Sequence, residues 1–418
     1  MKKTIYILLF LALIAVSGYL ISKKNIGTVN IPGDAPIDES GRTPLRADKV
    51  PSLPGFEIPA GFSLNIFAKN VPGARAIEID PKGRILVSET SEGKIVALSD
   101  KNGDHVSDEQ KVLASGLKKP HGLAMNCKGV EGCFLYVAER DELSRFPYDA
   151  EALTLGKKEN LMRIASSIAD RHFTRSILFL PPSEEDTLLI SVGSSCDVCH
   201  EKDNDHASIL SYNIKTGVKE VYAKGLRNAV FMALNPLGGK VFVTEMGRDN
   251  LGDNIPPDEI NIIEKGKNYG WPICYGKNIH DTQFDKNTYI RNPCMEFSAG
   301  GGSTFGGETP SFIDLQAHSA PLGLAFIPEE GWSEEYRHNM LVAYHGSWNR
   351  STPTGYKIVR IKMNAQGEYL GTEDFISGWL TKGGAKTGRP VDIKVLPGGV
   401  AYISDDSSGV IYRLSKIK

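Results

Sequence analysis

The stretch FMALNPLGGKVFVTEMG, residues 231–247, joins an apolar run, an NPLGG turn and a second apolar run. Apolar and polar residues alternate in these runs, as in strands that bury one or both faces. The same pattern recurs at residues 76–90, 122–140, 176–194, 323–347 and 392–406. A third apolar run follows several copies, at residues 93–99, 207–214, 355–363 and 409–415. Six copies of a multi-stranded unit predict an all-β fold, a six-bladed β-propeller.

A closed propeller normally pairs its two chain ends, because closure leaves no exposed sheet edge. The segment GFSLNIFA (61–68) is therefore expected to complete the blade formed by residues 392–415. Two β-sandwiches are the alternative, since the copies are irregularly spaced. Six copies of one kind favour the propeller.

The composition fits this fold and excludes one class of partner. The 418 residues are 41% hydrophobic, and the 43 glycines and 23 prolines indicate many turns between short strands. The net charge is -2, and no long basic run occurs, so we expect no nucleic-acid partner.

The N-terminus is predicted to be a targeting segment, separate from the fold. Two lysines precede an apolar run from Ile5 to about Ile21, which indicates a signal peptide or a membrane anchor over residues 1–23. Residues 24–55 are polar, rich in Pro and Gly and without periodicity, and we expect a linker there. The propeller, residues 56–418, would then face an extracytoplasmic space: periplasmic, secreted or membrane-anchored.

The six cysteines form three close pairs, Cys127/Cys133, Cys196/Cys199 and Cys274/Cys294. In an exported protein such pairs suggest disulfides, and six free thiols fit poorly. The run Cys196-Asp-Val-Cys199-His200 also matches a c-type haem attachment site. It directly follows a predicted propeller strand, without a surrounding helical cytochrome domain. A disulfide-pinned loop is the preferred interpretation, and haem stays the alternative.

Residues just before the first strand of five copies share a chemical character. Each of these segments contributes a His or an Arg: Pro120-His121, His172 to Arg175, Arg227-Asn228, His318 to Pro321 and Gly388 to Pro390. Propeller ligands usually sit at one mouth of the central channel. The recurrence suggests a ring of cationic and imidazole groups around an anionic ligand, with a His available as a base.

Several motifs, in order, resemble one known family. They are HFTRSI, GLRNAVFMALNP, DEINIIEKGKNYGWP, HSAPLGLAF, HGSWNRSTPTGYKIVRI and GRPVDI. Residues 56–418 resemble the quinoprotein sugar dehydrogenases of the soluble glucose dehydrogenase and L-sorbosone dehydrogenase type. The resemblance implies a six-bladed propeller that binds pyrroloquinoline quinone (PQQ) and calcium. It also implies an oxidoreductase that acts on an aldose or a sugar aldehyde.

The resemblance implies roles for individual residues. His172 matches the family's base, which takes a proton from the substrate hydroxyl as a hydride moves to the quinone, a task that suits imidazole. Arg227 and Asn228 match the pair beside the cofactor, where a guanidinium also stabilises negative charge on the quinone. Further cofactor contacts are implied for Arg389 and for Arg350 or its neighbour Asn349.

Two departures stand beside these matches. Val391 replaces a second arginine of the glucose enzymes, and Arg171 replaces an Asp beside their base. Each residue taken alone also has a purely structural interpretation: a turn histidine at His172 or a loop-bracing arginine at Arg227.

The loop EMGRDNLGDNIPPDE (245–259) matches the family's calcium loop. Backbone carbonyls of Gly247 and Arg248 would hold the catalytic calcium, with Arg248 standing where the family has Pro. Glu259 and Tyr269 match a second, structural calcium region. A solvated acidic loop explains Asp249, Asp253 and Asp258 equally well. The run DKNGDHVSDE (100–109) resembles a calcium loop too, but a hairpin turn explains it as well.

The sequence thus predicts an extracytoplasmic PQQ- and calcium-dependent dehydrogenase with a small sugar substrate and an electron acceptor that the sequence does not specify. Two alternatives belong to other classes, since propellers host unrelated functions. One is a non-enzymatic propeller that binds carbohydrate or protein, and the other is a calcium-dependent lactonase.

Overall fold

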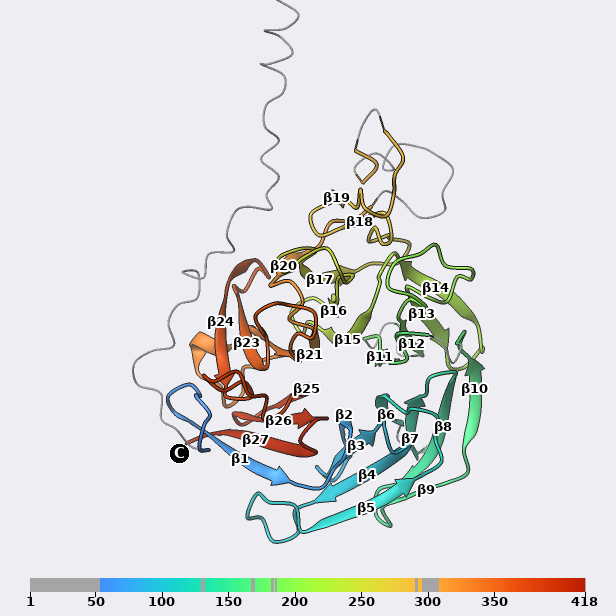
Figure 1. Ribbon diagram of the computed structural model, residues 1–418. Coiled ribbons are helices and arrows are strands. Elements are labelled where there is room, and N and C mark those ends of the chain that lie inside the picture. The colour runs from blue at the N-terminus through green and yellow to red at the C-terminus, as the bar shows by residue number, and fades with distance from the viewer. Residues whose placement is uncertain are drawn as a thin grey trace, which may run out of the picture. The chain divides into compact units, whose positions relative to one another are not determined.

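The structure is a computed structural model that describes residues 53–128, 132–166, 170–181, 184, 186–289, 292–294 and 308–417 (Figure 1). The predicted leader, residues 1–23, and the predicted linker as far as residue 52 lie outside this part of the chain. Within the described ranges, no helix has the length and apolar character needed to cross a membrane.

Six antiparallel sheets stand around a central axis like the blades of a propeller (Figure 1). From the axis outward, blade 1 consists of β2 (Ala74–Ile79), β3 (Ile85–Glu89), β4 (Lys94–Ser99) and β5 (Glu109–Ala114). Blade 2 consists of β6 (Gly122–Lys128), β7 (Gly132–Ala138), β8 (Glu142–Asp149) and β10 (Glu159–Arg163), with β9 (Thr154–Leu155) beside β8. Blade 3 consists of β11 (Ile177–Phe179), β12 (Thr187–Val192), β13 (Ser208–Asn213) and β14 (Lys219–Lys224).

The other three blades repeat this order. Blade 4 consists of β15 (Ala229–Leu234), β16 (Val241–Glu245), β17 (Asp258–Ile263) and β20 (Ile313–Leu315). Blade 5 consists of β21 (Pro321–Phe326), β22 (Met340–Tyr344), β23 (Lys357–Met363) and β24 (Tyr369–Ser377), with the short helix η4 (Glu334–Tyr336) between its first two strands. Blade 6 consists of β25 (Pro390–Leu396), β26 (Val400–Asp405), β27 (Val410–Lys416) and β1 (Phe62–Ala68). A separate hairpin, β18 (Cys274–Tyr275) and β19 (Ile279–His280), extends from blade 4.

The innermost strands form a closed ring. β2 contacts β6, β6 contacts β11, and the series continues through β15, β21 and β25 back to β2. Each predicted repeat supplies the first two strands of one blade. These findings confirm the six-bladed propeller and exclude two separate sandwiches.

The last blade joins the two ends of the described propeller. β1 pairs antiparallel with β27, with Phe62 opposite Lys416 and Leu64 opposite Leu414. In Figure 1 the blue β1 lies beside the red β27. The predicted closure of the ring by residues 61–68 is confirmed.

In blades 1 and 4, an Asp or Asn side chain stabilises the turn between the first two strands. In blade 1, Asp80 Oδ1 accepts hydrogen bonds from the backbone amides of Lys82 and Arg84, at 2.9 and 2.8 Å. In blade 4, Asn235 Oδ1 accepts one from the Leu237 amide at 2.8 Å. Such side chains mimic a backbone turn, which explains the recurring D-P and N-P pairs of the repeat.

The inner strands of neighbouring blades approach each other very closely. The Gly122 amide donates to the Arg175 carbonyl at 2.8 Å, so blades 2 and 3 are joined through backbone. A Cβ at Gly122 would lie 2.5 Å from that carbonyl oxygen, and one at Gly323 would lie 2.6 Å from the Cα of Asp392. Glycine is required at both contacts because a side chain would separate the blades.

The hydrophobic core consists of layers between adjacent blades. One layer joins blade 6, through Phe67 and Ile411, to blade 1, through Ile77 and Val87. Similar layers lie between blades 2 and 3, 3 and 4, and 5 and 6. Because most blades are covered on both faces, a middle strand such as β3 is buried along its whole length, including its polar residues Ser88 and Glu89.

The closure predicts a local test of stability. Leu64→Ala should lower the free energy of unfolding by about 2–5 kcal/mol, because Leu64 is fully buried between blades 5 and 6. Asn65→Ala, the neighbouring exposed position on β1, is the control and should change it by less than about 0.5 kcal/mol. Urea unfolding followed by tryptophan fluorescence measures both. Equal effects would show that β1 does not contribute to the core.

Candidate active site

Polar side chains connect all six blades at the end of the channel where the inner strands begin. The direct contacts are Thr90 Oγ1 to the Pro120 carbonyl, Ser176 Oγ to His121 Nδ1, the Arg227 side chain to Asp197, Asn349 Nδ2 to Asp249 Oδ1, Arg389 Nε to the His345 carbonyl and Arg75 Nη1 to Asp406 Oδ2. Together these contacts run once around the ring, from blade 1 through blade 6. Three of the predicted pre-strand residues, His121, Arg227 and Arg389, take part in these contacts.

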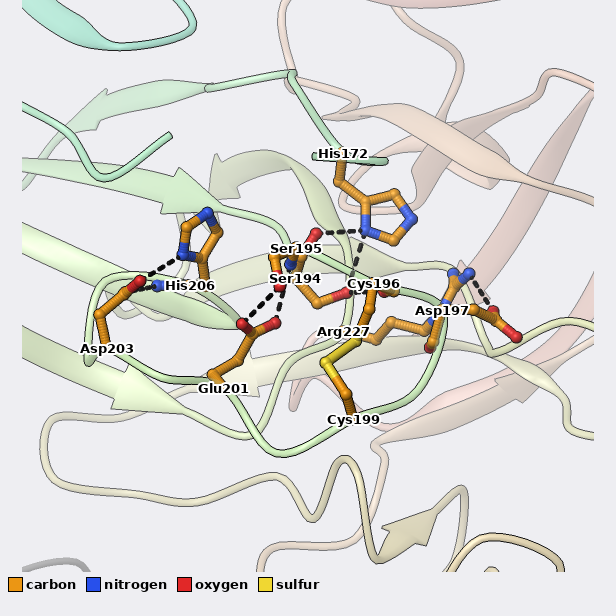
Figure 2. Close-up of a disulfide and its surroundings, with 10 residues drawn as sticks. All are labelled: His172, Ser194, Ser195, Cys196, Asp197, Cys199, Glu201, Asp203, His206 and Arg227. Atoms are coloured by element: carbon orange, nitrogen blue, oxygen red, sulfur yellow. Dashed lines mark hydrogen bonds and ion pairs between the residues drawn. A yellow bond between two sulfur atoms is a disulfide. The ribbon is translucent and has the colours of Figure 1, made fainter. Parts of the chain in front are cut away.

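His172 precedes β11 and is held through one of its two ring nitrogens. Its Nδ1 lies 2.9 Å from the Ser194 carbonyl oxygen and 3.0 Å from Ser194 Oγ, as Figure 2 shows. Because the carbonyl can only accept, Nδ1 carries the proton, and Nε2 is left as the unprotonated nitrogen. No described residue hydrogen-bonds to Nε2. The imidazole is thus oriented to take a proton from a ligand.

The environment of His172 keeps it neutral. Burial, and then the charge of Arg227, lower its pKa to about 3. The Ser194 carbonyl and Asp197 act in the opposite direction but do not outweigh them. The free nitrogen of His172 is therefore available as a base at any pH above about 4.

Gly193 brings His172 and Asn228 together. A Cβ at this position would lie 2.6 Å from the Cβ of His172 and 2.7 Å from Asn228 Oδ1. Asn228 is buried, its Nδ2 approaches Met246 Sδ at 3.4 Å, and its Oδ1 has no hydrogen-bond partner. A buried amide oxygen without a partner is costly, and its place beside the imidazole suggests that a ligand supplies the donor.

Arg227 is almost completely buried and is held by two acidic side chains. Its Nη2 donates to Asp197 Oδ1 at 2.6 Å and to Asp249 Oδ2 at 3.3 Å, and its Nε donates to the Asp197 carbonyl at 2.9 Å. Its Nη1 donates to the Met246 carbonyl at 3.1 Å. The guanidinium has a fixed position, and its charge is largely balanced within the protein.

Asp249 is the junction of three blades. Besides Arg227 from blade 4, it contacts Asn349 of blade 5 at 2.8 Å and Arg171 of blade 3 at 3.7 Å. Burial raises the pKa of Asp249, while Arg227 opposes this rise. The sequence leaves open whether Asp249 is a solvated residue or a member of a calcium loop. In the structure its carboxylate interacts with Arg227 and Asn349. Arg171, the departure beside the base, is 56% exposed and lies at the same junction.

The last residue of the loop from Gly247 to Asp258 anchors the loop through hydrogen bonds. Asp258, which is buried, accepts hydrogen bonds from the Gly247 amide at 3.0 Å and the Ala320 amide at 2.9 Å. Burial raises its pKa to about 7. The Arg248 side chain forms an ion pair with Asp281 at 2.8 Å. Neither carbonyl oxygen of Gly247 and Arg248 accepts a hydrogen bond from a described residue, so both are available to a cation.

Glu245 and Glu259 form a buried acidic pair beside this loop. They lie directly opposite each other on β16 and β17, and Asn261 Nδ2 donates to both, at 3.0 and 2.9 Å. Burial, and then the charge of Glu259, raise the pKa of Glu245, and burial raises the pKa of Glu259 to about 7. The Oδ1 of Asn261 is buried without a partner.

A cavity of about 20 Å³ lies against this pair and is also lined by Arg227, Gly247, Arg248 and Tyr269. It is large enough for one water-sized species. The Tyr269 hydroxyl already donates to the Ile262 carbonyl at 2.6 Å and accepts from the Glu264 amide at 3.0 Å. Its hydroxyl therefore serves the fold, whereas Glu245 and Glu259 supply carboxylates to the cavity.

The remaining predicted residues lie elsewhere on the same rim. Arg389 donates from Nε to the His345 carbonyl at 3.1 Å and from Nη2 to the Gly346 carbonyl. Arg350 donates from Nη1 to the Ala317 carbonyl at 3.1 Å, and its buried Nε has no partner. Val391 is fully buried in the core. Arg389 and Arg350 are thus anchored at the mouth, on blades 6 and 5.

Two other residues of the proposed ring are braces. Arg175 is fully buried and donates from Nη1 to the carbonyls of His172 and Thr174, at 2.8 and 2.9 Å. His318 Nε2 lies 2.9 Å from the Gly252 carbonyl and fixes the loop of blade 4. Both residues position neighbouring chain segments.

Sequence reasoning missed an ionic cluster on the opposite side of the mouth. Asp406 accepts from Arg75 at 2.7 Å and contacts His345 Nε2 at 2.9 Å. Burial would raise the pKa of Asp406, but His345 and Arg75 outweigh it and lower the value to about 2. Arg75 begins the inner strand of blade 1, the position that carries His or Arg in the other repeats. The repeat itself therefore offered this signal.

All three predicted cysteine pairs are disulfides, and no described cysteine is free. Cys196 and Cys199 close a loop beside His172 and Arg227 (Figure 2), while His200 packs against Phe284 with ring centroids 5.2 Å apart. Their sulfurs bond to each other, which supports the disulfide-pinned loop over haem attachment. In the loop at residues 100–109, Asp100 and Asp108 accept backbone amides of their own turn, as expected for a hairpin.

A second, larger cavity lies away from this chemistry. It has about 500 Å³ and is lined by residues of all six inner strands and by Pro236, Pro328 and Pro397 from the turns that follow three of them. It therefore occupies the turn end of the channel and contains none of the predicted site residues. We place the site at the other end because the oriented imidazole, the buried guanidinium and the unpartnered Asn228 Oδ1 are there.

Residues 56–417 match the model of the TrAA12-like family. The chain belongs to this family. An uncharacterized protein of Borreliella burgdorferi is 30% identical over 384 residues, which cover 88% of this chain and 93% of that protein. The pyrroloquinoline quinone-dependent pyranose dehydrogenase of Coprinopsis cinerea is 23% identical over 82% of this chain and 52% of that protein. The chain thus spans about half the length of the Coprinopsis enzyme.

Among solved structures, the calcium structure of a Trichoderma reesei enzyme of carbohydrate-active enzyme family AA12 has a TM-score of 0.69. It is 20% identical and covers 89% of this TrAA12-like chain and 100% of the solved one, so it supports the fold. These matches confirm the predicted family, that of the PQQ-dependent sugar dehydrogenases, and with it the prediction of an oxidoreductase. PQQ and calcium, the predicted cofactors, are both named for these relatives.

Gly193 offers a test of the site that leaves its polar residues intact. Gly193→Ala should displace His172 or Asn228, because the new Cβ would lie within 2.7 Å of both side chains. We expect sugar-dependent dye reduction to fall about 100-fold, the loss that a misplaced catalytic group typically causes. Gly383→Ala, where the nearest neighbour of a Cβ would be Thr381 Oγ1 at 3.8 Å, is the matched control and should retain full activity. Full activity in Gly193→Ala would contradict this geometry.

Proposed function

We propose that this chain oxidises a sugar or sugar aldehyde outside the cytoplasm, with PQQ and calcium as cofactors and His172 as the general base. The observation that carries the proposal is the orientation of His172. Its Nδ1 is held by Ser194, and its Nε2 is free at the mouth of a propeller of the TrAA12-like family.

His172 would accept the proton of the substrate hydroxyl at Nε2. Ser194 holds the proton on Nδ1, so the same ring need not rotate or change tautomer before it reacts. The nearby charge of Arg227 favours the neutral imidazole and would stabilise negative charge that develops on a ligand. A base that is neutral in the resting protein and fixed in direction suits this step.

The rim residues fit a planar, polyanionic quinone. Arg227, Asn228, Arg350 and Arg389 would hold PQQ, and two of their buried polar atoms, Asn228 Oδ1 and Arg350 Nε, have no protein partner. Arginine matches carboxylates through paired donors, and PQQ carries three carboxylates. When bound, PQQ takes up a hydride equivalent, two electrons and a proton, from the substrate carbon.

The loop of blade 4 fits calcium at two places. The free carbonyl oxygens of Gly247 and Arg248 would provide hard ligands for one ion beside the quinone. Glu259, with Glu245 and the backbone of Tyr269, would provide a second site at the small cavity. Two buried carboxylates that face each other are destabilising unless a proton or a cation intervenes, which supports the second site.

An extracytoplasmic location is supported by the disulfides, because such bonds persist in oxidising compartments. The segment at residues 1–23 would deliver the protein there, as a cleaved signal or as an anchor, and residues 24–55 would link it to the propeller. A small sugar substrate suits a family of sugar dehydrogenases, and a separate electron acceptor would reoxidise the cofactor.

A PQQ titration tests the proposal directly. The cofactor-free protein should bind micromolar PQQ with an absorbance change and then reduce an artificial acceptor when aldoses or sorbosone are added. His172→Ala should still bind PQQ, but turnover should fall about 10²- to 10⁴-fold, as for the loss of a general base. His105→Asn, at an exposed histidine of the hairpin in blade 1, is the control and should remain active.

No PQQ binding by the wild-type protein would refute the quinoprotein assignment. Calcium-dependent lactone hydrolysis without PQQ would then favour the lactonase alternative. Carbohydrate binding without turnover would favour the non-enzymatic propeller.

The buried acids predict a pH dependence that calcium should reduce. Asp258 and Glu259 have pKa values of about 7 in the folded protein and about 4 in the unfolded chain. Between these values the folded state holds more protons, so the free energy of unfolding should fall as the pH rises from about 4 to about 7. Bound calcium keeps the Glu259 carboxylate ionised, so calcium should flatten this fall relative to EDTA.

Urea unfolding at several pH values, with calcium or EDTA, measures this effect. Magnesium at the same concentration is a control for charge, because it requires stricter geometry. Glu259→Gln should abolish most of the calcium effect. An identical pH dependence with calcium and with EDTA would contradict a cation site at Glu259.

A further inference from the structure

The loop closed by the Cys196–Cys199 disulfide lies beside His172 and Arg227 (Figure 2). It contains two residues between the cysteines, and it begins shortly after β12 ends at Val192. One side of the loop contacts the segment that holds the imidazole, and the other side contacts the guanidinium. The disulfide is therefore placed where a change in loop shape would reach both groups.

The contact with His172 runs through Ser194. The hydroxyl of Ser194 donates to the Cys196 carbonyl at 2.6 Å, which leaves its oxygen and the Ser194 carbonyl to accept from His172 Nδ1. Glu201, just beyond the disulfide, accepts from the Ser195 amide and hydroxyl, both at 2.7 Å. The loop is thus anchored on both sides of the disulfide, and the position of Cys196 fixes the hydroxyl rotamer beside the base.

The contact with Arg227 runs through Asp197, which lies between the two cysteines. Arg227 Nε donates a hydrogen bond to the Asp197 carbonyl at 2.9 Å, and Arg227 Nη2 donates one to the Asp197 carboxylate at 2.6 Å. The same carboxylate oxygen accepts the Asp249 amide at 2.9 Å. Burial would raise the pKa of Asp197, but the Asp249 amide and Arg227 outweigh it and lower the value. Asp197 therefore stays ionised and holds Arg227 close to His172.

We propose that the Cys196–Cys199 disulfide is a redox-sensitive positioning element, through which a dithiol reductant can reversibly switch the site off. The proposal rests on the proposed roles of His172 and Arg227. A dithiol would transfer two electrons and two protons to the S–S bond, giving two cysteine thiols and a new disulfide in the reductant. Cys196 and Cys199 are half-buried, whereas Cys274 and Cys294 are 3% and 0% exposed, so a reductant reaches the site disulfide more easily than Cys274–Cys294. It also reaches Cys127–Cys133, where Cys127 is exposed.

Opening the loop has a predictable effect on the imidazole. Without the covalent link, the backbone around Asp197 gains conformational freedom, and the hydrogen bonds between Asp197 and Arg227 weaken. The charged groups around His172 are Arg227, Asp197 and Arg175, and burial and Arg227 have the largest effects. Greater solvation and a more distant Arg227 both favour the protonated ring. The pKa of His172 should therefore rise by roughly one unit or more.

The test compares two double variants. Cys196→Ser/Cys199→Ser opens the site loop, and Cys127→Ser/Cys133→Ser removes the disulfide between β6 and β7, at the turn end of blade 2. The first readout is the pKa of His172 in the cofactor-free protein, from an NMR titration assigned with His172→Ala. The second is the pH profile of kcat in the PQQ-loaded protein.

The site variant should show the raised pKa of His172 and an acidic limb of kcat moved upward by a similar amount. At neutral pH, where the ring stays unprotonated, displacement of His172 and Arg227 should lower kcat about 10-fold or more. The control variant should match the wild type in all three. A role in folding alone would reduce the active fraction without moving the acidic limb. An unchanged His172 pKa and an unchanged kcat in the site variant would overturn the proposal.

Two further measurements keep the test decisive. Wild-type protein treated with dithiothreitol, with its thiols mapped by alkylation and mass spectrometry, should reproduce the shift and regain activity on reoxidation. Asp197→Asn removes the negative charge that raises the pKa of His172, so with the disulfide intact this pKa should not rise as it does in the site variant. If wild-type protein fails to bind PQQ, the proposed function fails, but the NMR comparison still decides whether the disulfide positions His172.

Discussion

The antiparallel pairing of β1 with β27 is the contact on which the rest of this propeller depends. It joins segments more than 340 residues apart and fixes blade 6 between blades 5 and 1. Because the inner strands approach to backbone contact at Gly122 and Gly323, a shift of one blade would displace its neighbours. The loops that begin the inner strands are thereby held at fixed separations. The proposed site needs such rigidity, since His172, Arg227 and Arg389 come from separate segments that belong to different blades.

The same closure makes it possible to bury charge at the channel mouth. Arg227 is 3% exposed, which would be unfavourable without compensation, and Asp197 and Asp249 provide it from two different loops. The result is a fixed positive group near a neutral imidazole, with both oriented before any ligand arrives. Preorganised dipoles and charges of this kind stabilise developing charge without reorganisation at the moment of reaction.

Blade 4 departs from the rules that its neighbours follow. Glu245 and Glu259 place like charges opposite each other in adjacent strands, and Asn261 leaves a buried oxygen without a partner. Cross-strand pairs normally avoid this arrangement. Violations of local rules concentrate at functional sites, where a ligand or an ion compensates for them. The long loop after β16 and the two flanking disulfides belong to the same region, so the propeller carries its most elaborate chemistry on a single blade and the loop before it.

The sequence alone determined the architecture, because each blade is a local strand–turn–strand unit whose alternation and turn residues recur six times. It also indicated His172, Arg227 and Asn228, since they stand at the same place in the repeat, and it paired the cysteines because each pair is close along the chain. Tertiary structure alone decided which of these residues face the channel mouth. Arg175 and His318 occupy equivalent repeat positions but serve as braces, whereas Asp197, Asp249 and Glu245 became site residues through contacts with distant loops. Such roles depend on burial and on the pairing of charges between blades, and these exist only after the ring has closed.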